Sequence, residues 1–352
     1  MSWEENVRKV VPYVAGEQPQ NKNVIKLNTN ENPYPPAPNV KDVLCGFDYA
    51  SLRKYPDPDV SRLVSALAKR HGLPKEQVFV GIGSDDVLAM SFLTFFHSDK
   101  PILFPDITYS FYDVWAKLYE IPYECQPLDE NFRIRKADYK KENGGIVIAN
   151  PNAPTGVCEG SSFFEEIVKA NPDSVVIVDE AYVDFGGESC VPLIDKYENL
   201  LVVQTFSKSR ALAGLRIGYA MGSKKLIKYL NDVKFSFNSY TMNTVTIEAG
   251  VASVENEEYF RHITAKIMET RENTKKRLAE LGFVFQDSKT NFIFASHKRV
   301  PAQELFDVLR QNEIYVRHWN RPRIENYLRI SIGTDEEMKT VLDFLEHYLK
   351  GK

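Results

Sequence analysis

Short apolar runs alternate with amphipathic stretches over the first two thirds of the chain. Several runs are nearly continuous in Val, Ile and Leu, which is typical of parallel strands buried on both faces. The stretches between them repeat apolar residues at helical spacing; Leu63, Ala66 and Leu67 share one such face, and Gly72 ends that helix. We expect strands within 77–83, 100–105, 122–128, 144–152, 174–182 and 199–209, and helices within 59–74, 84–96, 108–120 and 161–171. This order predicts an α/β fold with a mainly parallel central sheet covered by helices.

The last third of the chain has a different pattern. A long helical stretch covers 255–281, and the final helix opens with Thr334 and Glu337 in the spacing of a capping box. Short strands are expected within 291–296, 313–319 and 327–333. Because the first forty residues are polar and rich in proline, we expect them to lie as an arm on another surface. The predicted parts are an N-terminal arm, a large domain and a small C-terminal α/β domain, over residues 1–40, 41–250 and 251–352.

Composition and charge narrow the class of protein. Of the 352 residues, 43% are hydrophobic and 26% are charged, which is enough apolar content for a sizeable core. The net charge of −4 argues against a nucleic-acid-binding protein, which usually carries an excess of basic residues. The four cysteines lie far apart without a C-x-x-C pair, so neither a disulfide framework nor a metal site is expected. No signal-like or membrane-spanning run is visible, so we expect a cytoplasmic protein without membrane partners.

A glycine-rich turn, GIGSDD (81–86), follows the first of these strands. Ligands of open α/β sheets bind beyond the carboxyl ends of the strands. The amides of Ser84 and Asp85, at the start of the next helix, would suit an anion there. An ordinary strand-to-helix turn capped by Ser84 explains the same residues. The turn is not a dinucleotide fingerprint, because it lacks the third glycine.

Two further strands end on charged residues. Asp179 follows an apolar run, where it would either hold a proton on a heteroaromatic nitrogen or lie at a solvated strand end. Lys208 follows the next run, and a desolvated lysine near cations becomes nucleophilic enough to form an imine with an aldehyde. Thr205, Ser207 and Arg216 would suit a phosphate. The alternative is a surface lysine, with the arginine in a salt bridge.

Together these features meet the requirements of one cofactor. Pyridoxal 5'-phosphate needs amide and hydroxyl donors for its phosphate, a carboxylate for its ring nitrogen and a lysine for its aldehyde. Each feature is ambiguous alone, but their combination on successive strands predicts a pyridoxal-phosphate enzyme.

Several segments also carry a resemblance to a known family. NPNAPTG (150–156), VDEAYVDF (178–185) and TFSKSRALAGLRIGY (205–219) resemble the class II, fold-type I pyridoxal-phosphate aminotransferases. LNTNENPYPP, KYPDP and VRHWNRPRIENYLRISIGT are similar, more specifically, to the family of histidinol-phosphate aminotransferases. The resemblance covers nearly the whole chain. It implies a large cofactor-binding domain, an arm that packs on the small domain and on a dimer partner, and a homodimer with shared active sites.

The resemblance implies roles for individual residues. Lys208 would form the internal aldimine and shuttle a proton, Asp179 would pair with the pyridine nitrogen, and Tyr182 would bond the phenolic oxygen of the cofactor. Tyr109 would stack on the ring, unless it is a core aromatic, and Tyr55 would reach the phosphate in the neighbouring subunit. The residues implied at the cofactor phosphate are Ser84, Asp85, Thr205, Ser207 and Arg216. Those implied at the substrate are Arg329, at a carboxylate, and Arg317 and Tyr13, near a phosphate; a solvated basic patch is the alternative for Arg317 and Arg321.

One position departs from the family pattern. Related enzymes carry asparagine immediately before PTG, where it bonds the phenolic oxygen of the cofactor, but this chain has Ala153 there. Either Asn152 takes that role or Tyr182 acts alone, and we expect Asn152 to bind the cofactor.

The resemblance implies a reaction as well. Histidinol phosphate would give its amino group to 2-oxoglutarate, by ping-pong kinetics, yielding imidazole-acetol phosphate and glutamate in histidine biosynthesis. Three alternatives stay open: an aminotransferase for aromatic or other amino acids, a decarboxylase similar to that of threonine phosphate, and a non-catalytic nucleotide-binding protein that uses the 81–86 turn.

Overall fold

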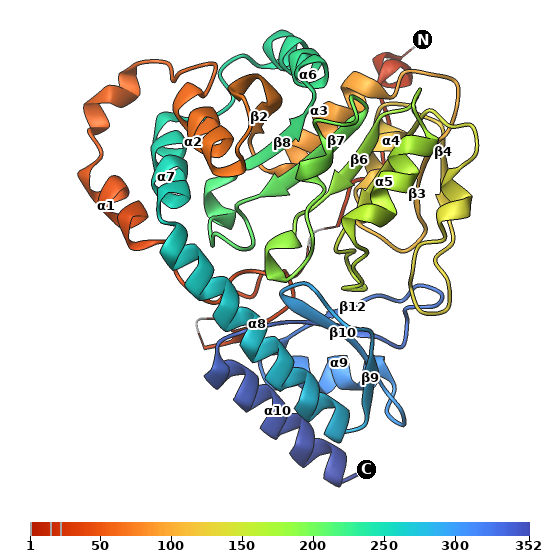
Figure 1. Ribbon diagram of the computed structural model, residues 1–352. Coiled ribbons are helices and arrows are strands. Elements are labelled where there is room, and N and C mark those ends of the chain that lie inside the picture. The colour runs from red at the N-terminus through yellow and green to blue at the C-terminus, as the bar shows by residue number, and fades with distance from the viewer. Residues whose placement is uncertain (1, 15, 22) are drawn as a thin grey trace.

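A seven-stranded sheet forms the centre of the upper part of the molecule in Figure 1. The structure is a computed structural model, and it describes residues 2–14, 16–21 and 23–352. The strands pair in parallel except β8, which runs antiparallel to both of its neighbours. In sheet order they are β2 (Val78–Gly81), β8 (Gly218–Gly222), β7 (Leu200–Thr205), β6 (Val176–Asp179), β5 (Gly145–Ala149), β3 (Ile102–Pro105) and β4 (Tyr123–Gln126). The predicted mainly parallel sheet is confirmed.

Two hydrophobic cores lie on the two faces of this sheet. Val176 and Val178 of β6 face one core, and Ile177, between them, faces the other. Because side chains alternate along a strand, this division explains why the strands read as continuous apolar runs. The helices of this part are α1 (Pro38–Gly46), α2 (Ser61–His71), α3 (Ser84–Phe95), α4 (Tyr112–Leu118), α5 (Ser161–Ala170), α6 (Lys224–Phe237) and α7 (Thr244–Glu255). Short 3-10 helices are η1 (Trp3–Asn6), η2 (Tyr49–Arg53), η3 (Lys75–Gln77), η4 (Lys136–Tyr139), η5 (Val183–Phe185), η6 (Val191–Leu193) and η7 (Ala213–Leu215).

A second, smaller sheet lies in the lower part of Figure 1, beside the long helix α8 (Glu257–Glu280). Helix α8 packs against the C-terminal helix α10 (Asp335–Lys350). The predicted capping box of α10 is confirmed, because Thr334 and Glu337 each bond the backbone of the other. The remaining elements are β9 (Phe283–Phe285), β10 (Phe292–His297), α9 (Ala302–Gln311), β12 (Arg317–His318) and β13 (Leu328–Ser331), with sheet order β12-β13-β10-β9.

Two predicted helix boundaries and one predicted cap residue were wrong. The stretch 255–281 is interrupted at Asn256, whose side chain accepts a hydrogen bond from the amide of Tyr259 and so caps α8 separately from α7. The helix expected over 108–120 begins only at Tyr112, because Thr108 is drawn aside by a hydrogen bond to Asn152. Helix α3 does begin at Ser84, but the cap position belongs to Gly83, and no side chain makes a cap bond there.

The N-terminal segment touches both sheets. Strand β1 (Ile25–Lys26) pairs in parallel with β11 (Ile314–Tyr315) beside the small sheet. Tyr13 stacks on Phe111, next to the large sheet, with ring centroids 4.1 Å apart. The segment therefore spans the two parts of the molecule. Its packing on a dimer partner and the boundaries at residues 40 and 250 stay predictions, and residue 250 falls within α7.

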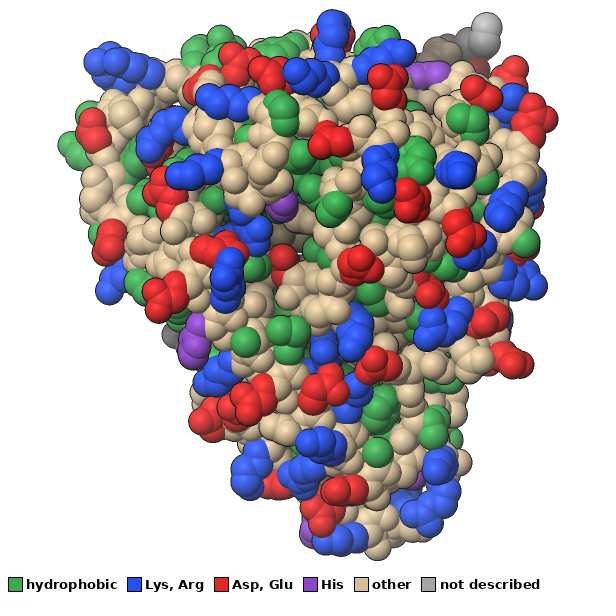
Figure 2. All heavy atoms as spheres, in the orientation of Figure 1, with side chains coloured by type: hydrophobic (Ala, Val, Ile, Leu, Met, Phe, Trp, Pro, Cys, Tyr) green, Lys and Arg blue, Asp and Glu red, His purple; other side chains and the backbone are tan. Residues whose placement is uncertain are grey.

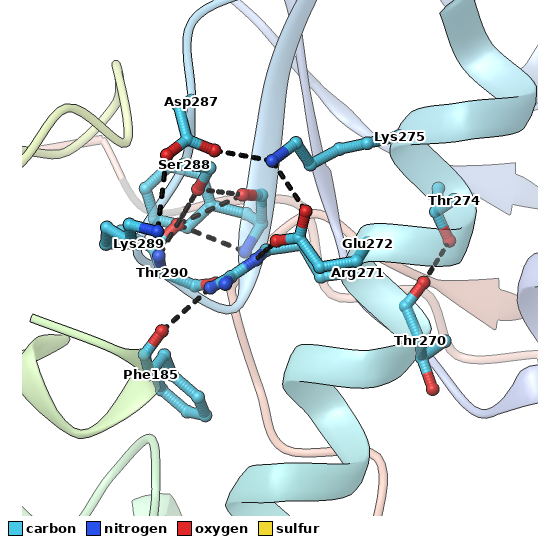
Figure 3. Close-up of polar contacts among 11 residues, drawn as sticks. Phe185, Thr270, Arg271, Glu272, Thr274, Lys275, Asp287, Ser288, Lys289 and Thr290 are labelled. Carbon is cyan, nitrogen blue, oxygen red and sulfur yellow. Dashed lines mark hydrogen bonds and ion pairs between the residues drawn. The ribbon is translucent and has the colours of Figure 1, made fainter.

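A buried arginine also joins the two parts. Arg271 of α8 is 3% exposed and donates hydrogen bonds to the carbonyl oxygens of Phe185, at 2.8 Å, and Thr290, at 2.9 Å. Figure 3 shows the Arg271 side chain between these two segments, with Lys275 and Asp287 paired beside it. Because the acceptors are backbone atoms of different parts, this contact holds the lower part in register with the 3-10 helix that follows β6.

The surface matches the modest net charge. Acidic and basic side chains are interspersed over the face shown in Figure 2. Within the described residues, no helix is both long and apolar enough to cross a membrane. The same residues contain no group of three or more His, Cys, Asp or Glu side chains suited to a metal ion.

Candidate active site

Two adjoining cavities open at the carboxyl ends of the parallel strands. The inner one, of about 180 Å³, and the outer one, of about 410 Å³, share Thr29, Asp85, Tyr109, Ala153, Tyr182, Lys208 and Arg216 in their walls. Predicted residues that line only the inner cavity are Ser84, Asp179, Thr205 and Ser207. Predicted residues that line only the outer cavity are Tyr13, Arg317 and Arg329. The structure thus brings together every predicted site residue except Asn152 and Tyr55.

Asp179 ends β6 at the floor of the inner cavity, where it is 5% exposed. Tyr112 donates a hydrogen bond to its Oδ2 at 2.8 Å, and the amide of Ala181 donates to its Oδ1 at 3.2 Å. Burial raises the pKa of the carboxyl to about 6, although the hydrogen bond from Tyr112 opposes this rise. No ion pair compensates the carboxylate among the described residues. A protonated heteroaromatic nitrogen would supply the missing positive charge.

Lys208 follows β7 and extends its amine toward the N-terminal segment. Its Nζ donates to the carbonyl oxygen of Thr29 at 3.1 Å and lies 5.9 Å from the centroid of the Tyr182 ring. The Asn32 side chain donates to the carbonyl oxygen of Lys208 at 3.0 Å, which holds the backbone of the lysine. No carboxylate pairs with the amine in the described part of the chain, so the lysine is available to an electrophile in the cavity.

Anion-binding groups gather at one end of the inner cavity. Ser207 and Thr205 bond each other through their hydroxyls at 3.0 Å, and Arg216 pairs with Asp85 at 3.3 Å. The amides of the first turn of α3 have no acceptor within the helix. Gly218 lets β8 approach this turn, because a Cβ there would lie 2.2 Å from the amide nitrogen of Ser84. Amides, hydroxyls and a guanidinium in one place form a suitable phosphate site.

A half-buried arginine lines the outer cavity. Arg329 lies on β13, and its guanidinium carbon sits 5.3 Å from the Phe292 ring and 5.1 Å from the Trp319 ring. Its Nη2 donates to the carbonyl oxygen of Asn28 at 2.9 Å, while its buried Nε has no hydrogen-bond partner within the described chain. Burial lowers the pKa of this guanidinium. A half-buried cation with an unused, buried donor suits a carboxylate.

A second cation lines the outer cavity. The guanidinium carbon of Arg317 is 5.5 Å from the centroid of the Trp319 ring, and Arg321 lines the same cavity. Arg317 and Arg329 are both half-buried, whereas Arg321 is exposed. The cavity therefore offers several cations beside one indole, because Arg317 and Arg329 are also direct partners across β12 and β13.

We expect Asp179 to destabilise the cofactor-free protein as the pH rises. Its pKa, raised from 3.8 to about 6, means that the folded chain binds this proton more tightly than the unfolded chain. The resulting stabilisation is complete below the unfolded pKa and is lost as the pH rises through the folded pKa, a change of roughly 3 kcal/mol. Asp179→Asn removes this dependence, so its Tm relative to the wild type should increase from pH 5 to pH 8 in calorimetry. A Tm difference that is constant with pH would contradict this expectation.

Comparisons with known proteins agree with this geometry. The family model described as aminotransferase class I and II matches residues 22–345. A histidinol-phosphate aminotransferase of Lactococcus lactis subsp. cremoris (strain MG1363) is 54% identical over 352 residues, 100% of this chain and 99% of that protein. One from Chromohalobacter salexigens is 49% identical, over 98% of each chain. The chain belongs to the histidinol-phosphate aminotransferase family.

Solved structures establish the fold independently. Histidinol-phosphate aminotransferase from Sinorhizobium meliloti, in complex with pyridoxal-5'-phosphate, matches with a TM-score of 0.84 at 22% identity, over 93% of this chain and 91% of that one. The enzyme from Clostridium acetobutylicum matches with a TM-score of 0.85 at 22% identity, over 94% of this chain and 100% of that one. The predicted fold type I is therefore confirmed.

Asn152 does not line either cavity in this structure, so its binding of the cofactor stays a prediction. Its Nδ2 donates to the carbonyl oxygen of Ile107 at 2.9 Å and to Thr155 Oγ1 at 3.0 Å, and its Oδ1 accepts from Thr108. All the polar atoms of the side chain are therefore engaged outside the cavities, whose wall is formed by Ala153 instead. This member of the histidinol-phosphate aminotransferase family presents no side-chain amide from this loop.

Tyr55 lies away from both cavities of its own chain. The side chain is 82% exposed and stacks on Tyr240, with ring centroids 4.7 Å apart. The role that family resemblance implies for it concerns a neighbouring subunit, so it stays a prediction.

Sequence reasoning missed three residues of the site. Tyr112 bonds Asp179, Trp319 contacts Arg317 and Arg329, and Asn30 lines the outer cavity while bonding Tyr182. Tyr112 and Trp319 are aromatic residues in segments that also supply core residues. Their residue types therefore do not distinguish a place in the site from a place in the core. Asn30 lies in the LNTNENPYPP segment, which indicated the family but had no assigned chemistry.

Proposed function

We propose that the protein transfers the amino group of L-histidinol phosphate to 2-oxoglutarate, giving imidazole-acetol phosphate and L-glutamate. The observation that carries this proposal is the arrangement of Lys208, Asp179 and Arg329 around one continuous cavity with further cations in its wall. The relatives at 49% to 54% identity, all named histidinol-phosphate aminotransferases, support the choice of donor.

The residues of the inner cavity suit pyridoxal 5'-phosphate. Asp179 is a buried carboxylate without a cation, and Thr205, Ser207, Arg216 and the α3 amides offer phosphate donors. The Sinorhizobium meliloti relative was solved with this cofactor. When bound, the cofactor supplies an electron sink that stabilises negative charge at the substrate α-carbon.

The side chains have separate tasks in the proposed reaction. The amine of Lys208 acts as a general base when it takes the proton from the α-carbon of the donor. It acts as a general acid when it gives that proton back later in the transfer. The carboxylate of Asp179 keeps a proton on the ring nitrogen through charge, and Tyr182 donates a hydrogen bond to the phenolic oxygen. Tyr109, whose hydroxyl is held by Asp85 at 2.7 Å, covers the ring.

The outer cavity serves the two substrates in turn. Arg329 binds the carboxylate of 2-oxoglutarate or glutamate by paired hydrogen bonds. Arg317, Arg321 and Tyr13 bind the phosphate of the donor. One cavity thus accepts a phosphate ester and a dicarboxylate alternately, as ping-pong transfer requires.

We propose further that the protein works as a homodimer. Exposed aromatic and apolar side chains cluster around residues 49–55 and 235–240, which suits a second copy. In that dimer Tyr55 would reach the cofactor phosphate of the partner subunit.

A panel of amino donors tests the proposed function. With 2-oxoglutarate as acceptor, we expect histidinol phosphate to give the highest kcat/KM, measured by glutamate formation. Equal or better rates with tyrosine or phenylalanine would replace the proposal by a broader aminotransferase. Release of carbon dioxide from threonine phosphate, without glutamate formation, would indicate the decarboxylase, and failure of the protein to bind pyridoxal phosphate would reject both enzymes.

A further inference from the structure

The segment Thr29–Asn32 holds two residues of the active site at once. The carbonyl of Thr29 accepts from Lys208 Nζ, and Asn32 donates to the lysine backbone. Between them, Asn30 donates from Nδ2 to the hydroxyl oxygen of Tyr182 at 2.9 Å. Asn30 is 1% exposed and lies in the wall of the outer cavity, so its amide is both buried and adjacent to the chemistry.

The hydrogen bonds around Asn30 fix the orientation of its amide. Its backbone N–H donates to Ser331 Oγ at 3.0 Å, which leaves the hydroxyl hydrogen of Ser331 to donate to Asn30 Oδ1, also at 3.0 Å. With the amide oxygen engaged on β13, the NH₂ group must face Tyr182. Asn291 donates to the carbonyl of Asn30 at 3.0 Å and holds the backbone in its left-handed conformation, at φ 55°.

This orientation decides what the Tyr182 hydroxyl can do. A phenolic oxygen that accepts from an amide cannot also send its own hydrogen to that amide nitrogen. The hydroxyl hydrogen is therefore directed away from Asn30, and Tyr182 lines both cavities. The side chain of Ala153, on the same wall, has no hydrogen-bond donor, so Tyr182 supplies the donor at this position.

We propose that Asn30 is a positioning residue that makes Tyr182 a one-way hydrogen-bond donor toward the phenolic oxygen of the cofactor. This inference rests on the proposed function. Through Ser331, it also ties the donor to β13, the strand that carries Arg329, so the small sheet holds both the carboxylate site and the orientation of the tyrosine.

The test is the pH midpoint of the visible absorbance change of the bound cofactor. The high-pH form of a lysine-bound pyridoxal group carries negative charge on its phenolic oxygen, and a hydrogen bond to that oxygen stabilises this form. We expect Asn30→Gly, which tolerates the positive φ, to raise the midpoint by roughly one pH unit. Tyr182→Phe should raise it at least as far, and adding Asn30→Gly to Tyr182→Phe should change it no further.

Two controls separate positioning from loss of structure. Ser331→Ala frees the side-chain amide of Asn30 to rotate, so it should also raise the midpoint, by a smaller amount. This variant serves as the test if Asn30→Gly does not fold. Asn32 lies in the same segment but does not contact Tyr182. Any effect of Asn32→Ala on the midpoint should therefore be equal with and without Tyr182→Phe.

The proposal is overturned if Asn30→Gly leaves the midpoint unchanged, or raises it equally in the Tyr182→Phe background. It is also overturned if Asn30→Gly folds poorly and Ser331→Ala has the wild-type midpoint. These outcomes leave the proposed function standing as long as the wild type uses histidinol phosphate, so the two failures are distinguishable.

Discussion

Replacing Lys208 by alanine should reduce turnover by at least about 10⁴-fold, the upper range for a general acid–base group. The loss is expected to be this large because the amine has two tasks, attachment of the cofactor and proton transfer at the substrate α-carbon. Single-turnover kinetics with histidinol phosphate would measure it, and the visible absorbance of the lysine-bound cofactor should disappear from the purified variant.

Two variants serve as controls for this result. Lys208→Arg keeps a cation at the end of β7 but cannot form the same bond, so we expect it to be nearly as inactive. Lys289→Ala removes a lysine that pairs with Asp287 on the surface, 39% exposed, and should have wild-type activity. Retention of both turnover and absorbance in Lys208→Ala would reject the proposed cofactor chemistry.

Replacing Arg329 by glutamine should reduce kcat/KM for 2-oxoglutarate by roughly 10²- to 10³-fold, because removing one partner of a hydrogen-bonded charge pair costs several kcal/mol. The Phe292 and Trp319 rings lie against the half-buried guanidinium and shield part of it from water, so solvent replaces the lost charge only in part. Glutamine keeps hydrogen-bond donors but removes the positive charge. The loss of rate should therefore appear mainly in the half-reaction with the dicarboxylate. This half-reaction is measured separately, with glutamate as the substrate.

Arg317→Gln is the matched variant, since Arg317 lies against the same indole and is half-buried like Arg329. We expect it to raise KM for histidinol phosphate and to change the 2-oxoglutarate half-reaction little. If Arg329→Gln and Arg317→Gln weakened both half-reactions equally, the assignment of a separate cation to each substrate would be wrong.

The sheet could be predicted from the sequence because its physical cause is local. Strands such as β6 and β7 are buried on both faces, so nearly every side chain in them must be apolar, and the polar residues that follow mark the carboxyl edge. Lys208 and Asp179 could be predicted for the same reason. Helix ends were less predictable, as at Asn256, because a single side-chain cap divides a pattern that is periodic on both sides.

The contacts between distant segments could not be predicted in this way. Asn30 meets Tyr182 across 152 positions of the chain, and its partner Ser331 lies 301 positions away. Asn152 looked suitable by its neighbourhood in the sequence, yet the carbonyl of Ile107 and the hydroxyl of Thr155 take its hydrogens. Whether a polar side chain faces a cavity depends on which other hydrogen-bond acceptors the fold brings near it. The residue type alone does not show which acceptors these are.

The indole of Trp319 has a consequence for how substrate range can change. It lies against both Arg317 and Arg329, but Arg329 has further contacts of its own with Phe292 and with the carbonyl of Asn28, so mutations at Arg317 can alter which donor is accepted while those contacts persist. A lineage built on this plan can explore new amino donors while it continues to use the same common acceptor, because the arginine proposed for the acceptor keeps contacts of its own.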